Sequence, residues 1–415
     1  MAVWLVLALA AGVRTLSRPA SHTVFPIFVA GAERYWADQP LYDEQPGLDY
    51  FRYPPAFAVA ITPLSRLGLR LGGTLWAWLS CAVLLVGLWR FLRDVLPPAW
   101  SEQRSAVFLV LGALGALPGI WNGQSNALVV GLLLLGAVEV VRQNWWRAAF
   151  LLAPAVAIKL TPIVPALLLC ALWPRRLAPR LLIVLVLLAL VPFLTRPPEI
   201  VLQHYRDWLG QLTHLSGKRW GGFRDAWTVW EVVRHPFIED GAAFPLAEHF
   251  DSAPYRALQV LTGAATLAWC LWLSRTGSSP RRLVNLTLAM GCAWLMLFGP
   301  AVEHATYVFL AAPLSWALLE RAAWPRGRWL AWAAFVLVMV FGWGSLTRPF
   351  VATLPVVLLA LPIGTALFIV WLIGYATRHE PARNSASRNS SMFFHTSRTA
   401  LGGLTASLPS RSRKA

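Results

Sequence analysis

Charged residues and cysteine are scarce in this chain of 415 residues. Only 13% of the residues are charged, whereas 57% are hydrophobic, and this balance excludes an ordinary water-soluble domain of the same size. The four cysteines all lie within apolar stretches. They therefore predict neither a disulfide framework nor a metal site, and we expect no metal and no other cofactor.

Lysine is scarcer still, with three lysines against 33 arginines and a net charge of +17. A large positive charge can indicate a nucleic-acid partner. Here the arginines fall on short connections between apolar stretches and in the C-terminal tail, which is typical of the cytoplasmic side of a membrane protein. We therefore expect a lipid bilayer as the partner of these residues and no nucleic acid.

Long apolar runs follow one another along most of the chain, and several approach the roughly 20 residues that a helix needs to cross a bilayer. They predict an all-α integral membrane protein, a polytopic bundle of about 12 transmembrane helices over residues 1–376. Residues 2–13 are interpreted as a first span, with a cleaved signal peptide ending near Ala11 as the alternative. The strongest later runs are 73–91, 105–120, 127–141, 181–194, 257–274, 283–299, 307–319, 329–342 and 354–375.

Arginines on alternate short connections predict the orientation. Fourteen arginines lie on five connections that we place inside: 90–104, 142–147, 175–180, 275–282 and 321–328. The connections alternate between the inner and outer sides of the membrane only if residues 148–173 form two short helices that meet near Lys159. The protein is then a multi-pass protein of the cell membrane with both termini in the cytoplasm, and its basic tail, residues 377–415, is predicted to be disordered.

Two long segments, about 18–72 and 195–255, fall on the outer side in this topology. Each mixes helix-compatible stretches with Pro and Gly breaks, which predicts short helices at the outer leaflet. Asp43, Glu44 and Asp49 lie in the first of them, just before Tyr53-Pro54-Pro55. Because the following apolar stretch returns the chain to the membrane, we expect a carboxylate here to be partly desolvated.

Polar residues inside the apolar region are the main candidates for function. Lys159 lies between two apolar stretches, and its compact charge suits a phosphate oxygen; a snorkelling lysine at a helix end is the alternative. Gly123-Gln124-Ser125-Asn126 opens a span, either as a simple N-cap or as a helix start that attracts phosphate. Glu303-His304-Ala305-Thr306-Tyr307 interrupts two apolar runs, as an interfacial loop or as a group for proton transfer or phosphate contact.

Taken in order, these pieces resemble glycosyltransferase family 87, the polyprenol-phosphate-mannose-dependent α-mannosyltransferases of the GT-C fold class. The pieces are Tyr53-Pro54-Pro55, then Gly123-Gln124-Ser125-Asn126, then Lys159-Leu160-Thr161-Pro162 followed by Arg175-Arg176, and last Pro300 to Tyr307 with His304. The resemblance covers roughly residues 20 to 320. It implies a GT-C-like fold and the transfer of a hexose, mannose by the family's pattern, from a polyprenyl-phosphate donor to a lipid or glycan acceptor, on the outer face and with inversion.

The resemblance also implies roles for individual residues. Lys159, His304, Gln124, Asn126, Tyr53 and Tyr307 are expected to hold the donor phosphate and substrate. The family's base is an aspartate early in the first outer loop, but the matching stretch here reads Ser21-His22-Thr23-Val24-Phe25, without an acid. Asp49, Asp43 and His22, in that order, are the candidates for the base.

Two other classes stay open at this stage. A transporter or lipid flippase would also have many spans and a buried lysine, but it would show paired broken helices in matching halves, whereas these polar clusters lie on one face. An inactive family member would explain the missing early aspartate. The chain has no Asp-x-Asp pair, so an enzyme that binds a nucleotide sugar through a metal ion is not expected.

Overall fold

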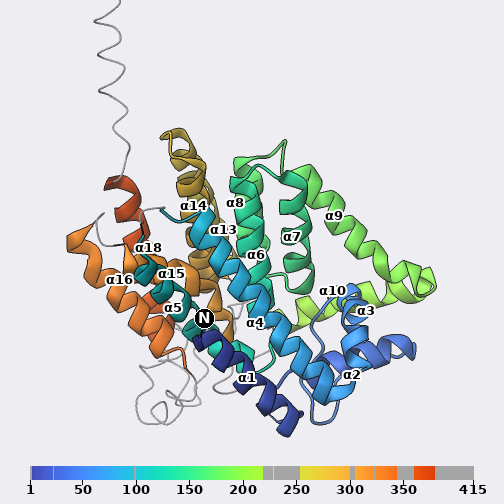
Figure 1. Cartoon of the computed structure of the whole chain (residues 1–415). Helices are drawn as coiled ribbons and strands as arrows, with labels where there is room; N and C mark the ends of the chain where they lie inside the picture. Colours follow the sequence, from blue (N-terminus) through green and yellow to red (C-terminus); the bar gives the residue numbers. More distant parts are fainter. Residues whose placement is uncertain are drawn as a thin grey trace, which may run out of the picture.

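The computed structural model describes residues 2–21, 23–97, 100–217, 228, 253–299, 304–320, 324–343 and 359–378. Over these ranges the protein is helical and contains no strand, only an isolated bridge between Gln45 and Leu48. The helices pack into a bundle, from α1 (Ala2–Ser17) to α18 (Ala360–Arg378) (Figure 1). Residues 379–415 of the predicted basic tail and most of the second outer segment lie outside the described residues, whereas Thr377 and Arg378 belong to α18.

Four helices in the described residues are long and apolar enough to cross a bilayer. They are α4 (Gly68–Asp94), α5 (Glu102–Trp121), the stretch Tyr255–Arg275 of α13 (Ala253–Arg275), and α18. Shorter apolar helices include α1, α6 (Asn126–Val141), α7 (Trp145–Ile158), α8 (Ile163–Leu172) and α9 (Ala178–Leu190), which runs into a 3-10 turn at Val191–Leu194. The prediction of a helical membrane protein is confirmed, and the number of about 12 spans stays a prediction.

The C-terminal half continues in the same manner. It comprises α14 (Pro280–Phe298), the 3-10 helix η3 (His304–Leu310), α15 (Ala311–Leu319), a short turn at Pro325–Gly327 and α16 (Arg328–Phe335) with a π-helical continuation at Val336–Val340. The predicted hairpin around Lys159 is present, because α7 ends at Ile158 and α8 begins at Ile163. Pro162 directly precedes α8. Proline suits a helix start because it has no backbone N–H, and the N–H groups of the first turn have no partner within the helix.

The packing of α4 against α6 shows why glycines occur in these spans. A Cβ atom on Gly87 would lie 2.7 Å from the carbonyl oxygen of Gly131, and one on Gly131 would lie 2.6 Å from the backbone of Val83. The two backbones therefore touch directly, as small residues allow in helix pairs within membranes. This contact holds α6, which carries the candidate site at its start, against the longest helix of the described chain.

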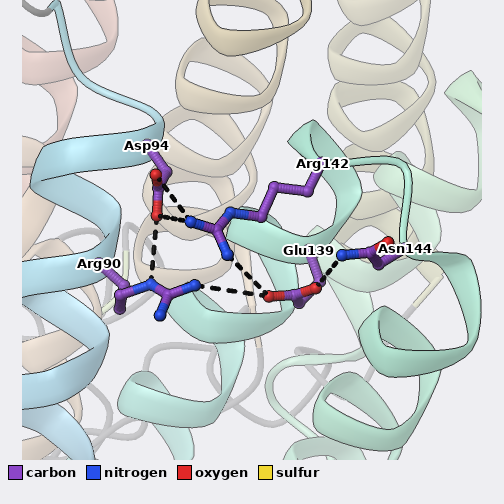
Figure 2. Close-up of polar contacts among 5 residues, drawn as sticks. All are labelled: Arg90, Asp94, Glu139, Arg142 and Asn144. Atoms are coloured by element: carbon purple, nitrogen blue, oxygen red, sulfur yellow. Dashed lines mark hydrogen bonds and ion pairs between the residues drawn. The ribbon is translucent and has the colours of Figure 1, made fainter.

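An ionic cluster joins three helices at the opposite end of α6 (Figure 2). Arg142 contacts Asp94 at 3.0 Å and Glu139 at 3.8 Å, and Arg90 contacts Asp94 at 3.2 Å and Glu139 at 3.9 Å. Asn144 donates from Nδ2 to Glu139 Oε2 at 2.7 Å. Two cations and two anions thus neutralise one another where α4, α6 and α7 meet, which spares the buried Glu139 the cost of an unpaired charge.

Short helices occupy the first outer segment, as predicted: α2 (Phe25–Trp36) and α3 (Pro55–Ser65). α4 begins at Gly68, whose φ of +74° makes the turn out of α3, and the predicted outer bound of about residue 72 stays a prediction. The second segment supplies α10 (Pro198–Gly217). In Figure 1 the labels of α2, α3 and α10 lie together at the lower right, away from the turn between α13 and α14. These helices enclose an aromatic core around Phe28, Phe51 and Phe57.

Candidate functional site

A tight chain reversal precedes α6 and is fixed by two other segments. Gly123 has a φ of +63°, a conformation that favours glycine. Thr23 Oγ1 donates to Asn122 O at 3.1 Å, the Val24 amide donates to the same oxygen at 2.9 Å, and Trp76 Nε1 donates to Gly123 O at 2.8 Å. The start of α6 is therefore held in place by the beginning of α2 and by α4.

The first residues of α6 are buried but not capped in the usual way. Ser125, the N-cap residue, makes no side-chain cap hydrogen bond, so the expectation that it acts as a simple N-cap is wrong. Its hydroxyl instead lies 3.3 Å from the hydroxyl of Tyr53, because the aromatic core places Tyr53 beside it: the Tyr53 ring stacks on Phe57 with centroids 4.6 Å apart. Amide groups at an uncapped helix start are suited to bind an anion.

Lys159 reaches this helix start from the α7–α8 hairpin. It has an extended backbone at the end of α7, and its Nζ donates to Asn126 Oδ1 at 2.7 Å. Asn126 is fully buried and in turn donates from Nδ2 to Gln124 Oε1 at 2.6 Å. The structure therefore brings together four residues that the sequence analysis singled out, Tyr53, Gln124, Asn126 and Lys159, which we call the lysine corner.

The Glu303–Tyr307 segment lies near the same end of the bundle but is described only in part. Glu303 lies outside the described residues, and His304 is the first residue of η3. A Cβ atom on Gly119, in the last turn of α5, would lie 3.7 Å from Ala305 O, so η3 runs beside the end of α5. Tyr307 is buried, and its hydroxyl donates to Met296 O at 3.4 Å. This contact directs Tyr307 into the helix packing.

The candidates for the base differ in their surroundings. Asp49 forms an ion pair with Arg52 at 2.9 Å and accepts the Tyr50 amide at 2.8 Å. Its side chain is 42% exposed, whereas Phe51, two residues later, is buried in the aromatic core. The partial desolvation of Asp49 stays a prediction. Asp43 is exposed. His22 lies outside the described residues, and among those described no group of three His, Cys, Asp or Glu side chains is placed to hold a metal ion.

Two further polar groups were not expected from the sequence. Glu33 and Arg66 line a pocket between α2 and α3. His204 of α10 is 5% exposed, and neither ring nitrogen has a hydrogen-bond partner in the described part of the chain. Its ring centroid lies 5.8 Å from that of Tyr35, and burial lowers the pKa of His204 below its usual value of 6.5. No local pattern marks these residues, because each depends on a contact between separate helices.

Comparison with known proteins tests the resemblance. Residues 51–300 match glycosyltransferase family 87. The chain belongs to this family. The match spans the Tyr53 loop, the start of α6 and the Lys159 hairpin, so all four residues of the lysine corner lie inside the matched region.

One curated relative of this family 87 chain is the polyprenol-phosphate-mannose-dependent alpha-(1-2)-phosphatidylinositol mannoside mannosyltransferase of Mycolicibacterium smegmatis (strain ATCC 700084 / mc(2)155). It is 30% identical over 144 residues, which is 31% of this chain and 32% of the relative. The match thus covers about a third of that relative's length. ArnT from Cupriavidus metallidurans, solved bound to undecaprenyl phosphate, is 16% identical with a TM-score of 0.36 over 91% of this chain and 77% of its own.

Proposed function

We propose that this family 87 protein transfers a hexose, mannose, from a polyprenyl-phosphate donor to a glycan or glycolipid acceptor at the outer face of the cell membrane. The observation that carries the proposal is the contact of Lys159 with Asn126 at the uncapped start of α6, 2.7 Å from Nζ to Oδ1. The name of the mycobacterial relative, which specifies a polyprenol-phosphate-mannose donor, supports the choice of donor and sugar.

The chemistry requires a stabilised leaving group. Attack by an acceptor hydroxyl at the anomeric carbon breaks the bond to the phosphate oxygen and inverts the configuration, and the polyprenyl phosphate departs with an added negative charge. Lys159 and the amides at the start of α6 are placed to offset this charge, since charge-assisted contacts aimed at developing charge lower the barrier. Gln124 and Tyr53 would position the phosphate, and His304 would contact it from η3. The buried Tyr307 would support this segment through its hydrogen bond to Met296 O.

The acceptor hydroxyl must lose a proton during the transfer. We place the base in the first outer segment, with Asp49 ahead of Asp43 and His22. Asp49 is held by Arg52, directly before Tyr53 of the lysine corner. Replacement of the base by a side chain that cannot accept a proton should lower turnover by roughly 100-fold or more.

The proposal is tested with purified protein in lipid nanodiscs, a radiolabelled polyprenyl-phosphate mannose donor and candidate glycolipid acceptors. We expect transfer by the wild type and a loss of about 100-fold in kcat in Asp49→Asn, with the donor KM retained. Full activity of Asp49→Asn with a dead His22→Ala protein would assign the base to the histidine instead. A wild type that moves lipid across the bilayer but transfers no sugar would refute the enzyme and favour the flippase.

The proposed topology places the lysine corner outside and the arginine-bearing connections inside. Ser278 lies in the turn between α13 and α14, next to Arg275 and Arg281. A cysteine at position 278 or 410 should resist a membrane-impermeant thiol reagent in intact cells and react after permeabilisation, whereas a cysteine at exposed Gly47 should react in both. Labelling of position 278 in intact cells would show that the predicted orientation is reversed.

A further inference from the structure

A pocket with a mostly apolar lining and two charged side chains, here called the outer pocket, lies between α2 and α3. It has a volume of about 360 Å³ and is lined by Glu33, Trp36, Thr62, Ser65 and Arg66 with two alanines. This volume lies within the range of roughly 300–1,000 Å³ that small-molecule sites occupy. The proposed chemistry at the lysine corner does not use these residues.

The wall of the outer pocket is fixed by hydrogen bonds. Trp36 Nε1 donates to Thr62 Oγ1 at 2.8 Å, and the Thr62 hydroxyl donates to Ala58 O at 2.8 Å. The Ser65 hydroxyl donates to Thr62 O, also at 2.8 Å. The indole ring is thereby tied to α3, so this wall of the pocket does not have to be ordered when a ligand arrives.

Two oppositely charged side chains complete the pocket without forming an ion pair. The Glu33 carboxylate makes no hydrogen bond or ion pair with any residue that the structure describes. The Arg66 guanidinium makes no side-chain hydrogen bond or ion pair within the described ranges and lies over the Trp36 ring, 5.8 Å from its centroid. Arg196 also lies over this ring, at 5.2 Å, and is paired with Asp38 at 3.1 Å. Because the charges of Glu33 and Arg66 offset each other and Arg196 is neutralised by Asp38, the pocket is close to neutral. Glu33 would repel a phosphate, whereas hydroxyl groups can donate to its carboxylate and accept from Arg66.

We infer that the outer pocket binds one hydroxyl-rich ring of the acceptor, from a glycan or from the head of a glycolipid. Glu33 accepts hydrogen bonds from ring hydroxyls, Arg66 donates to ring oxygens, and Trp36 offers an apolar surface to the ring carbons. That the bound ring belongs to an acceptor rests on the proposed function, whereas the binding of a polyhydroxylated ring rests on the residues of the pocket alone.

The position of the outer pocket indicates which part of the acceptor it holds. α2 starts beside Asn122 and α3 starts just after Tyr53, so both helices begin at the lysine corner. Both also reach the outer pocket near their ends. At 1.5 Å per residue, Phe25 and Glu33 are about 12 Å apart along α2. The ring in the outer pocket is therefore not the ring that reacts, and the acceptor must contain more than one ring. Binding energy from such a remote ring can position the reacting hydroxyl.

Ligand-observed NMR on the full chain in nanodiscs tests the binding directly. The probes are an α-linked mannotriose and myo-inositol, and the variants are Glu33→Gln and Arg66→Gln. The matched controls are Glu199→Gln and Arg70→Gln, whose side chains are exposed and do not line the pocket. Loss of a hydrogen bond to a charged group should weaken binding of at least one probe about tenfold or more in both pocket variants, with wild-type affinity in both controls. Equal affinity in all five proteins, or no binding by the wild type, would overturn the inference.

Transfer kinetics separate this inference from the proposed function. With an acceptor of several rings, Glu33→Gln should raise the acceptor KM about tenfold and leave the donor KM unchanged; with a single-ring acceptor it should change neither. A rise in the donor KM would place the pocket in the donor site and refute the assignment. If the wild type transfers no sugar, the proposed function fails while the NMR result still decides the pocket. Displacement of the soluble probe by a glycolipid in the nanodisc identifies a lipid-borne acceptor, and lack of displacement identifies a free glycan.

Discussion

Replacing Lys159 by glutamine or by methionine separates its possible functional and structural roles. Lys159 Nζ donates to Oδ1 of the fully buried Asn126 at 2.7 Å. Glutamine removes the positive charge but keeps a donor for Asn126, whereas methionine removes both. A buried acceptor left without its partner costs about 1–3 kcal/mol. Lys159→Met should therefore lower the unfolding temperature, and Lys159→Gln should leave it nearly unchanged.

Both variants should lose affinity for the donor, because both lack the charge. A hydrogen bond to a charged group contributes about 1.5–3 kcal/mol, which corresponds to a loss of roughly 10-fold to 150-fold in affinity. The assay is binding of polyprenyl-phosphate mannose to protein in nanodiscs, with the unfolding temperature measured on the same samples. If Lys159→Gln binds donor and transfers sugar like the wild type, the lysine only holds Asn126, and the assignment of the donor phosphate to the lysine corner is refuted.

Two further outcomes follow from the backbone of Gly123 and the burial of His204. Gly123→Ala should lower both the unfolding temperature and the affinity for the donor. The φ of +63° costs an alanine about 1–2 kcal/mol, and the added Cβ would lie 2.5 Å from Thr23 Oγ1. The double variant Gly123→Ala with Thr23→Ala should recover part of the lost unfolding temperature, and no recovery would argue against this contact. His204 has a lowered pKa because of its burial, with smaller opposing effects of Asp207 and Asp38. Its neutral form therefore stabilises the fold above pH 6.5, and this contribution is lost as pH falls below that value. His204→Phe should flatten the acid side of the stability profile measured by thermal unfolding, and an unchanged slope would show that other groups titrate there.

The helical membrane class could be predicted from the sequence because it depends on composition and on the length of apolar runs. The same holds for the hairpin around Lys159, where Pro162 and two apolar stretches act locally, and for the short helices of the first outer segment. Membership of family 87 could also be anticipated, since the order of the Tyr-Pro-Pro, Gly-Gln-x-Asn and Lys-x-x-Pro pieces is a property of the chain alone.

Local reasoning failed where a side chain had a choice of partners. Ser125 could cap its helix, but the aromatic core brings the Tyr53 hydroxyl to it instead. Asp49, by contrast, pairs with Arg52 only three residues away in the sequence, so its contact is local. The contact of Ser125 with Tyr53 is set by packing between distant segments, which the local pattern of residues does not encode.

The sequence by itself determined the class of the protein, its helices and the residue types available for phosphate and sugar chemistry. Only the tertiary structure decided which of them meet. Lys159 and Asn126 are 33 positions apart, Tyr53 and Ser125 are 72 apart, and Glu33 and Arg66 come from different helices around one pocket. Such contacts depend on how whole helices pack against one another, and the free energy of that packing is spread over many apolar side chains, so no short motif reveals it.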